Sequence, residues 1–237
     1  MAVLYRDGAI LRSDAVYPLH RAAASAALLF EPDEAVWSPL PRASWGPPAY
    51  RTTFRAAWDD AALWVRFDAT DDRPWHTCAR RDDRLWDEEV VEIFIDPAGQ
   101  GRNYAEVEIS PANVVCDLIV RTPWPALDSD PEWDWVGLES RVVVSAPDEN
   151  AHVRWTAVAR LPWAGLSSLG PEVASRIPPR ERDAWRINLF RIKRPHGPAA
   201  PERDAVYAAW SVPAGPSFHD PAMFPTLCFA GPLPAWR

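Results

Sequence analysis

The chain has 237 residues and a formal net charge of −8, with 14 Trp, 26 Pro and only 10 Gly. This length suits one sizeable domain, and the many prolines favour rigid connections between short strands over long helices. The acidic balance argues against nucleic acid and anionic membranes as partners and is compatible with neutral or cationic ligands. The three cysteines are widely spaced and match neither a disulfide framework nor a zinc site.

Two stretches bear on where the protein resides. Residues 1–10 lack the apolar core of a secretory signal peptide. The apolar stretch 21–30 is too short to span a bilayer and is followed by acidic residues. We therefore expect a cytoplasmic protein, or a secreted one if the true start lies upstream.

The N-terminal part, residues 1–48, is predicted to be an irregular segment that packs on the domain, with one short helix near residues 19–29. From Tyr50 onward the pattern becomes typical of β-strands. Strands are predicted at residues 51–58 and 63–68, on either side of a turn at Asp59-Asp60.

Residues 85–109 form the most informative stretch. It predicts two strands, the first ending at Asp96 and the second beginning at Tyr104, joined by a loop rich in turn formers. Side chains alternate between the faces of a strand, so Glu92, Glu106 and Glu108 share the face opposite the apolar residues. If the loop closes symmetrically, Glu92 lies opposite Glu108, with Glu106 one step along.

This carboxylate face is the candidate site. Like charges directly opposite each other destabilise a sheet. Something is therefore expected to satisfy them, and arginines, a cation and the hydroxyls of a ligand are the open alternatives.

Further strands follow toward the C-terminus. They are predicted at residues 114–120, 141–145, 153–161, 185–192, 205–210 and 226–230, with a short helix opened by Pro162. Short strands at this spacing, without interleaved helices, predict an all-β protein. We expect an antiparallel β-sandwich of jelly-roll or immunoglobulin-like two-sheet architecture over residues 49–237, with long loops and one or two short helices.

The motif Trp86-x5-Glu92, running on to Asp96, resembles the core of family 9 carbohydrate-binding modules and of the related DOMON-like sandwiches. Motifs at residues 104–113, 185–196, 209–211 and 218–224 resemble the same family. The resemblance spans roughly residue 50 to the C-terminus. It implies a β-sandwich that grips a sugar between two aromatic residues, hydrogen-bonds its hydroxyls and carries structural calcium.

Carried over residue by residue, the resemblance places the first stacking tryptophan on Trp86 and a hydroxyl-binding glutamate on Glu92. The second stacking residue falls on Phe218, where the family has tryptophan. The next hydroxyl-binding pair, Arg and Asn in the family, falls on Glu106 and Glu108. These departures change the charge of the side chains that would contact the sugar. The sugar specificity of the family therefore does not carry over to this chain.

Three other features bear on the site. Arg186 and Asn188 alternate away from the apolar residues of their strand, which predicts that they face the carboxylates. Arg186 is then either a counter-ion for the glutamates or a second sugar donor, and the sequence leaves both open. The acidic run at residues 87–89 is expected to be a solvated turn, with a calcium site as the alternative.

We therefore expect a non-catalytic protein that binds a saccharide, or a similar polyhydroxylated ligand, by aromatic stacking and carboxylate hydrogen bonds. A glycoside-cleaving hydrolase or an accessory subunit in carbohydrate catabolism is one alternative, because two of the carboxylates could meet the spacing that glycosidases need. A haem-binding electron-transfer domain built on Met223 and a histidine is the other. The sequence establishes no cofactor, and calcium, which the resemblance implies, is the one candidate.

Overall fold

The structure, a computed structural model, describes residues 3–4, 14–197 and 199–233. The strands of this part are β1 (Val3–Leu4), β2 (Val16–Arg21), β3 (Arg42–Trp45), β4 (Thr52–Trp58), β5 (Ala62–Asp71), β6 (Val90–Asp96), β7 (Tyr104–Ile109), β8 (Val115–Thr122), β9 (Asp128–Asp130), β10 (Glu139–Val144), β11 (Val153–Pro162), β12 (Ala184–Lys193), β13 (Val206–Ala209) and β14 (Thr226–Pro232). The short α-helices are α1 (Ala26–Leu29), α2 (Glu34–Trp37) and α3 (Pro171–Ala174). The 3-10 helices are η1 (Pro48–Tyr50), η2 (Leu85–Asp87), η3 (Trp163–Leu169), η4 (Glu202–Asp204) and η5 (Pro221–Met223). Among the described residues, no helix is long and apolar enough to cross a membrane.

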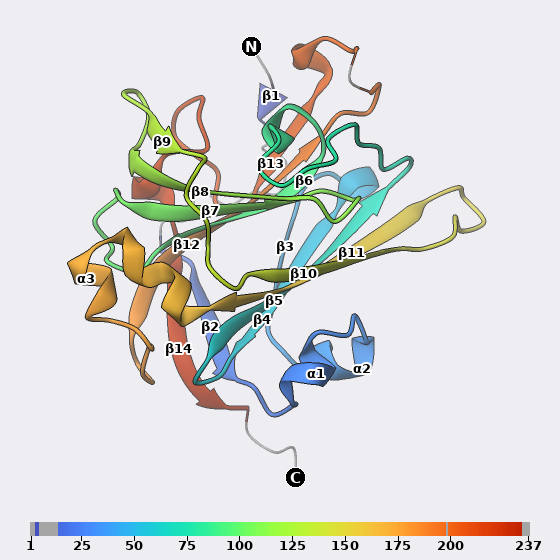
Figure 1. Cartoon of the computed structure of the whole chain (residues 1–237). Coiled ribbons are helices and arrows are strands. Elements are labelled where there is room, and N and C mark those ends of the chain that lie inside the picture. The colour runs from blue at the N-terminus through green and yellow to red at the C-terminus, as the bar shows by residue number, and fades with distance from the viewer. Residues whose placement is uncertain (1–2, 5–13, 198, 234–237) are drawn as a thin grey trace.

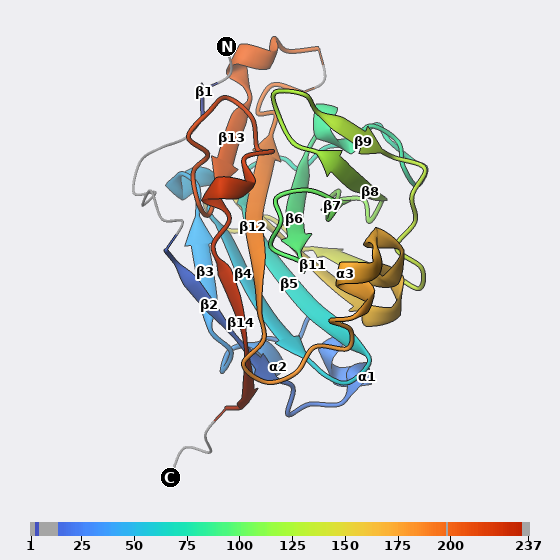
Figure 2. The ribbon, with the colours of Figure 1, turned by 90° about the vertical axis from the view of Figure 1, so that its left-hand side faces the viewer.

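The strands form one hydrogen-bonded sheet that curls over into two layers (Figures 1 and 2). Its order is β10-β11-β5-β4-β2-β14-β12-β6-β7-β8-β9, with β3 beside β4, β13 beside β12 and β1 beside β13. The first layer contains β10, β11, β5 and β4. The second contains β12, β6, β7 and β8, and β2 and β14 join the two along one side. The helices α1 and α2 cover the far side of the first layer (Figure 1).

The core lies between the layers because alternate residues of each strand point inward. Phe54, Val65 and Trp155 contribute to it from the first layer, and Ile93 and Val107 from the second, each at most 1% exposed. Burying a large apolar side chain stabilises a fold by roughly 1.5–3 kcal/mol. The predicted all-β sandwich with short helices is confirmed, and every strand predicted from residue 51 onward is present.

The N-terminal part is less irregular than predicted. Val16–Arg21 forms β2, which pairs in parallel with both β14 and β4, and Arg42–Trp45 forms β3. The sandwich is therefore not wholly antiparallel. A parallel pair needs a long crossover, which the chain through α1, α2 and β3 supplies. Pro18 conceals β2 in the sequence, because proline is rare inside strands.

Two predicted helices also differ in detail. The helix expected near residues 19–29 begins only at Ala26, since residues 19–21 belong to β2. The helix expected at Pro162 is the 3-10 helix η3, and Pro162 is its N-cap.

A second apolar cluster lies on the outer face of the second layer. Its floor is made by residues of β6, β7, β8 and β12, namely Val90, Phe94, Tyr104, Cys116, Leu118, Val120, Phe190 and Ile192. The β5–β6 loop (residues 72–89) and the β13–β14 loop (residues 210–225) pack over this floor through Leu85, Trp86, Phe218 and Phe224. We call these two loops the cover. The carboxylate face lies beneath it.

Candidate functional site

Glu92, Glu106 and Glu108 come together on the outer face of the second layer, and we call them the glutamate trio. The pairing of β6 with β7 places Glu92 opposite Glu108 and Phe94 opposite Glu106. This is the register that the sequence predicted. One carboxylate oxygen from each glutamate lies within 4.8 Å of the other two. The side chains share one face because the strand period is two residues.

The glutamate trio is buried and has few partners. Glu92, Glu106 and Glu108 are 2%, 4% and 0% exposed. Four of their oxygens are buried without a hydrogen-bond partner, and both oxygens of Glu108 are among them. No arginine or lysine of the described chain forms an ion pair with any of the three. An unpaired buried charge is costly, so these groups need a proton, a cation or a hydroxyl donor.

Burial governs the protonation of the glutamate trio. It raises the pKa of Glu106 to about 8. Burial, reinforced by the neighbouring carboxylates, raises the pKa of Glu92 and Glu108 well above the ordinary range. The cause is desolvation, which disfavours the charged form of an acid.

His219 lies beside the trio, and the sequence did not single it out beyond its place in the motif at residues 218–224. Its Nδ1 is 3.0 Å from the Tyr104 hydroxyl and 3.9 Å from Glu106 Oε2, and its ring stacks on Phe94 at 5.1 Å. Burial lowers the pKa of His219 to about 4, so at neutral pH it carries no positive charge. His219 therefore does not neutralise the trio.

Arg186 and Asn188 share the trio's face, as expected, but among the described residues neither forms a hydrogen bond or an ion pair with the glutamates. Arg186 lies opposite Asp96 at the end of β6 and donates to Thr226 Oγ1 at 3.4 Å. It is therefore no counter-ion for the glutamates. The fully buried amide of Asn188 donates to the Ser211 carbonyl and accepts from the backbone N–H groups of Leu189 and Ser211. Asn188 thus anchors the start of the β13–β14 loop.

Trp86 and Phe218 both pack against the second apolar cluster, from different loops. Trp86 lies in η2 and is partly buried, with the Arg84 guanidinium 5.5 Å from its ring centre. Phe218 is also partly buried. It stacks on Phe190 with ring centres 4.2 Å apart and meets Tyr207 edge-on at 5.8 Å. The structure therefore brings both predicted stacking residues to the cover of the carboxylate face.

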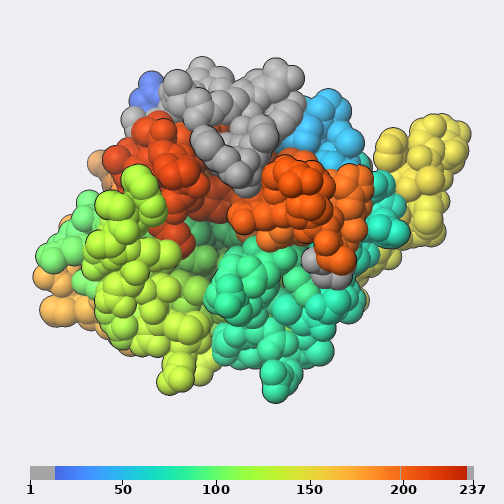
Figure 3. All heavy atoms as spheres, turned by 90° about the horizontal axis from the view of Figure 1, so that it is seen from above, coloured from blue at the N-terminus to red at the C-terminus, as the bar shows by residue number. Residues whose placement is uncertain are grey.

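The cover closes the carboxylate face in this conformation. Figure 3 views it from above, with the β5–β6 loop in green, the region near residues 120–130 in yellow-green and the β13–β14 loop in red. Because the glutamates are at most 4% exposed, a sugar can touch them only after the cover moves. A glycosidase also needs its two carboxylates open to the substrate, and this conformation does not offer that.

Trp124 is a surface aromatic residue that sequence reasoning did not single out. It is 48% exposed in the loop between β8 and β9. Its ring packs against Gly215, where a β-carbon would lie 3.5 Å from Cζ3. An ion pair of 2.6 Å between Arg121 and Asp130 closes the base of this loop. The signal in the sequence is a tryptophan flanked by two prolines in a polar loop.

The acidic run at residues 87–89 is not the solvated turn that was expected. Glu88 accepts hydrogen bonds from the backbone N–H groups of Thr77 and Cys78. Glu89 is fully buried and pairs with Lys193 at 2.7 Å. Only Asp87 of the three is exposed. The prediction failed because Glu88 is held by the folding of its own loop, and because Lys193, the partner of Glu89, lies far away in the chain.

A second acidic cluster can be compared with the glutamate trio as a possible metal site. Asp82, Asp117 and Asp134 also offer oxygens within 4.8 Å of one another. Arg81 pairs with all three, at 2.9 Å to Asp134, at 3.7 Å to Asp82 and in a close contact with Asp117. Its guanidinium already neutralises this cluster, so a cation fits poorly there. The glutamate trio has no such guanidinium or ammonium partner in the part of the chain that the structure describes, so a cation fits better there.

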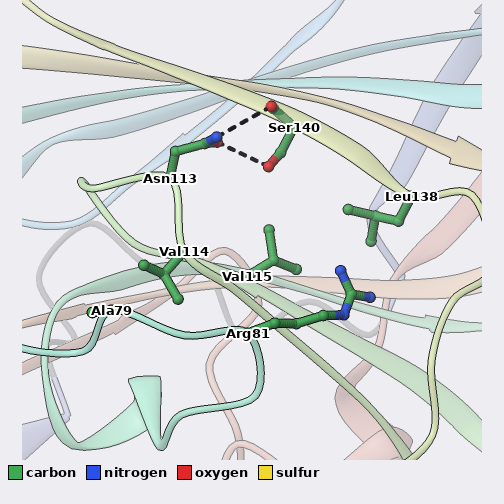
Figure 4. Close-up of a pocket in the computed structure, with 7 residues that line it drawn as sticks. All are labelled: Ala79, Arg81, Asn113, Val114, Val115, Leu138 and Ser140. Carbon is green, nitrogen blue, oxygen red and sulfur yellow. Dashed lines mark hydrogen bonds between the residues drawn. The ribbon is translucent and has the colours of Figure 1, made fainter.

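A surface pocket of about 250 Å³ lies elsewhere, beside the start of β8 (Figure 4). It is lined by Ala79, Arg81, Asn113, Val114, Val115, Leu138 and Ser140. The side chain of Asn113 bonds the backbone and side chain of Ser140 (Figure 4). None of the predicted site residues lines this pocket.

Comparison with known proteins identifies relatives of this fold. Residues 34–114 match the family described as carbohydrate family 9 binding domain-like. Comparison with curated proteins gives no match. A Bacteroides uniformis protein to which carbohydrate binding has been attributed aligns with a TM-score of 0.65 and 15% identity, over 91% of this chain and 98% of that chain.

Two structures of a family 9 carbohydrate-binding module from Caldicellulosiruptor kristjanssonii are similar too. The complex with cellotriose aligns with a TM-score of 0.60 and 12% identity, over 94% of this chain and 100% of that chain. The complex with glucose gives a TM-score of 0.58 and 13% identity, over 93% and 99%. The resemblance to this family is thus confirmed by the sequence match over residues 34–114 and by the fold over most of the chain.

Proposed function

We propose that this β-sandwich, which resembles family 9 carbohydrate-binding modules, binds a saccharide or a similar polyhydroxylated ligand on the outer face of its second layer, without covalent chemistry. The observation that carries the proposal is the combination of partly buried aromatic side chains with unpartnered carboxylates on that one face. The complexes of similar folds with cellotriose and glucose support a saccharide as the ligand.

Aromatic stacking is the first part of the proposed mechanism. The apolar C–H face of a sugar packs on an aromatic ring, and burying a large side chain contributes about 1–3 kcal/mol. Trp86 is the main platform, since its indole lies in the cover and is only partly buried. Phe218 supplies a second ring from the other loop of the cover.

Hydrogen bonding to carboxylates is the second part. A carboxyl group accepts hydrogen bonds in either protonation state, and each sugar hydroxyl can donate one. For this contact the β13–β14 loop must lift, separating Phe218 from Phe190 and exposing Glu106 and Glu108. Arg186 remains as a donor at the edge of the face. Asn188 is left out of the mechanism because its amide already holds the backbone of Ser211.

The test is isothermal titration with glucose, cellotriose and a panel of other mono- and oligosaccharides. We expect saturable binding by the wild type, and an affinity at least roughly fivefold lower, about 1 kcal/mol, in Trp86→Ala and in Phe218→Ala. Trp133→Ala is the matched control. It removes a partly buried indole that packs on Trp135 and bonds Ser168, away from the cover.

The titration gives different results if the proposal is right and if it is wrong. Binding that is lost in the two cover variants and kept in Trp133→Ala supports the proposal. A folded wild-type protein that gives no heat with any saccharide contradicts it. So does binding that is indifferent to Trp86 and Phe218, because the ligand then sits elsewhere.

A further inference from the structure

One edge of the sheet is open. Among the described strands, β10 is the last in the sheet order and pairs with β11 alone. In an antiparallel pair, the backbone groups of alternate residues point toward the partner strand. The Ser145 N–H bonds the Arg154 carbonyl of the facing chain, so the backbone of Val143 also faces β11. The N–H and C=O groups of Val142 and Val144 therefore point away from the sheet. We call these two valines the open edge.

Hydrogen bonds from side chains limit the open edge at both ends. Ser140 also points its backbone outward, but its carbonyl accepts a hydrogen bond from the Asn113 amide at 3.3 Å (Figure 4). Beyond the strand, the Ala146 carbonyl accepts a hydrogen bond from the Ser145 hydroxyl at 2.9 Å. Between these limits, the two valines of the open edge have both backbone groups free of any described partner, and Val143 lies midway between them.

The open edge is apolar on both faces of its strand. Val143 is 42% exposed and Val144 is 47% exposed, and their side chains point to opposite faces. Natural sheets protect such edges with prolines, bulges or free charges. The β10 strand contains no proline and pairs with β11 without a register shift, and the Arg141 guanidinium is held in an ion pair with Glu31. Exposed valines beside free backbone groups indicate a strand that can add another strand.

We propose that two copies of this chain pair through β10, antiparallel and across a two-fold axis at Val143. This register places Val142 of each copy opposite Val144 of the other, which pairs the free N–H and C=O groups of both valines in each copy. Valines then face valines on both sides of the joined sheet. A register centred on Val142 would instead place Val144 opposite Ser140, whose carbonyl is already bonded to Asn113.

The surroundings of the open edge suit a second copy. Figure 3 shows the β10–β11 hairpin, in yellow, standing clear of the rest of the molecule, so another chain can approach it. The chain carries a formal net charge of −8, but along β10 Glu139 pairs with Arg160 and Arg141 pairs with Glu31. Two copies can therefore meet along β10 without placing unpaired acids of this strand opposite each other.

The dimer is expected to be weak, because the open edge is short. It is also independent of saccharide binding, since β10 belongs to the first layer and the carboxylate face lies on the outer side of the second.

The experiment is sedimentation equilibrium of the full chain, over roughly a hundredfold range of concentration up to about 1 mM. We expect a reversible equilibrium between monomer and dimer. Val143→Lys places two ammonium groups opposite each other at the axis. Val144→Pro removes an outward N–H and leaves the hydrogen bonds to β11 in place. Each variant should raise the dissociation constant of the dimer at least about tenfold.

The control is Val16→Lys, which adds the same charge at a valine that is 57% exposed on β2, a strand that lies between β14 and β4. It should dimerise as the wild type does. Because Val143 and Val144 are exposed, both edge variants are expected to fold, and circular dichroism checks this. If Val144→Pro is unfolded, Val143→Lys alone decides by the same criterion.

Three results would overturn the inference. One is a folded wild type that stays monomeric up to about 1 mM, which would leave the open edge to a strand of another protein or to none. The second is a dimer that persists equally in the edge variants, because the contact then lies elsewhere. The third is a series of species larger than a dimer, since a two-fold pairing uses the open edge of each copy once and is closed.

Discussion

Lys193 is the only lysine of the chain, and its ammonium group is fully buried at one end of the space between the layers. It lies 2.5 Å from Asp71 and 2.7 Å from Glu89, and Arg191 lies 2.6 Å from Asp71. Two buried acids thus meet two buried bases. Although burial alone would raise it, Arg191 and Lys193 together lower the pKa of Asp71. Among the described residues, the one ion pair of Glu89 is with Lys193. Burial, with Asp71 adding to it, raises the pKa of Glu89 to about 7.

This difference predicts a pH dependence of stability. The folded pKa of Glu89 lies above its ordinary value of 4.5, so between pH 4.5 and 7 the folded state holds a proton that the unfolded state releases. The free energy of unfolding therefore falls as the pH rises through this window. We expect Glu89→Gln to reduce that fall, by about 3 kcal/mol at most.

Urea unfolding at several pH values from 5 to 8 measures this effect. Glu132→Gln, which changes an exposed carboxylate, is the control and should follow the wild type. Parallel pH profiles of wild type and Glu89→Gln would show that Glu89 is ionised throughout.

Asn188 gives a second prediction at the residue scale. Its buried amide makes three hydrogen bonds to the backbone of Leu189 and Ser211. Asn188→Ala should therefore lower the free energy of unfolding by about 2–4 kcal/mol in the absence of any ligand. Asn150→Ala, at an exposed turn, should change it by less than about 0.5 kcal/mol. An unchanged stability with loss of saccharide binding would instead make Asn188 a ligand contact.

At the scale of elements, the β8–β9 loop extends the cover. Trp124 presents an indole that is 48% exposed and that rests on Gly215 in the β13–β14 loop. If saccharides bind at the cover, a chain of several sugar units can reach this ring. Trp124→Ala should then weaken cellotriose binding by roughly fivefold and leave glucose binding unchanged, since stacking contributes about 1 kcal/mol.

The matched control is Leu127→Ala, which removes an exposed apolar side chain from the same loop. Equal affinities of wild type and Trp124→Ala for every oligosaccharide would confine the site to Trp86 and Phe218. This outcome leaves the proposed function intact, whereas an absence of binding by the wild type does not.

The contact between η3 and the β9–β10 loop also depends on one small residue. A β-carbon on Gly165 would lie 2.3 Å from Cδ1 of Trp135, whose indole N–H bonds the carbonyl of Pro162. Trp135 is almost fully buried and has little room to shift. Gly165→Ala should therefore destabilise the protein by about 2 kcal/mol or more in chemical unfolding. Gly215→Ala, where the nearest atom is at 3.5 Å, should cost less than about 1 kcal/mol. Equal effects of the two substitutions would contradict the packing argument.

At the scale of the whole molecule, the sequence predicted those features of the fold that depend on residues close together in the chain. The alternation in residues 90–109 and the turn-forming loop between its strands were enough to predict the Glu92–Glu108 pairing. The short strands and their turns were enough to predict the sandwich. In contrast, Pro18 hid β2, which is a strand because β14 and β4 lie on either side of it.

The rest depended on contacts between distant parts of the chain. The residues near Glu89 in the sequence do not predict its ion pair with Lys193. The residues near Glu108 do not predict that the loop with Phe218 and His219 covers the carboxylate face. The sequence therefore predicted which side chains share the carboxylate face, but it could not predict that they are buried. Burial is what turns an exposed acidic patch into a site that requires a partner.

The most direct test of the central proposal is a crystal structure of the protein with cellotriose. We expect sugar density over the outer face of the second layer, in contact with Trp86 and Phe218, with the β13–β14 loop displaced wherever a hydroxyl reaches Glu106 or Glu108. Sugar bound instead in the pocket beside Asn113 and Ser140, with the cover closed, would contradict it.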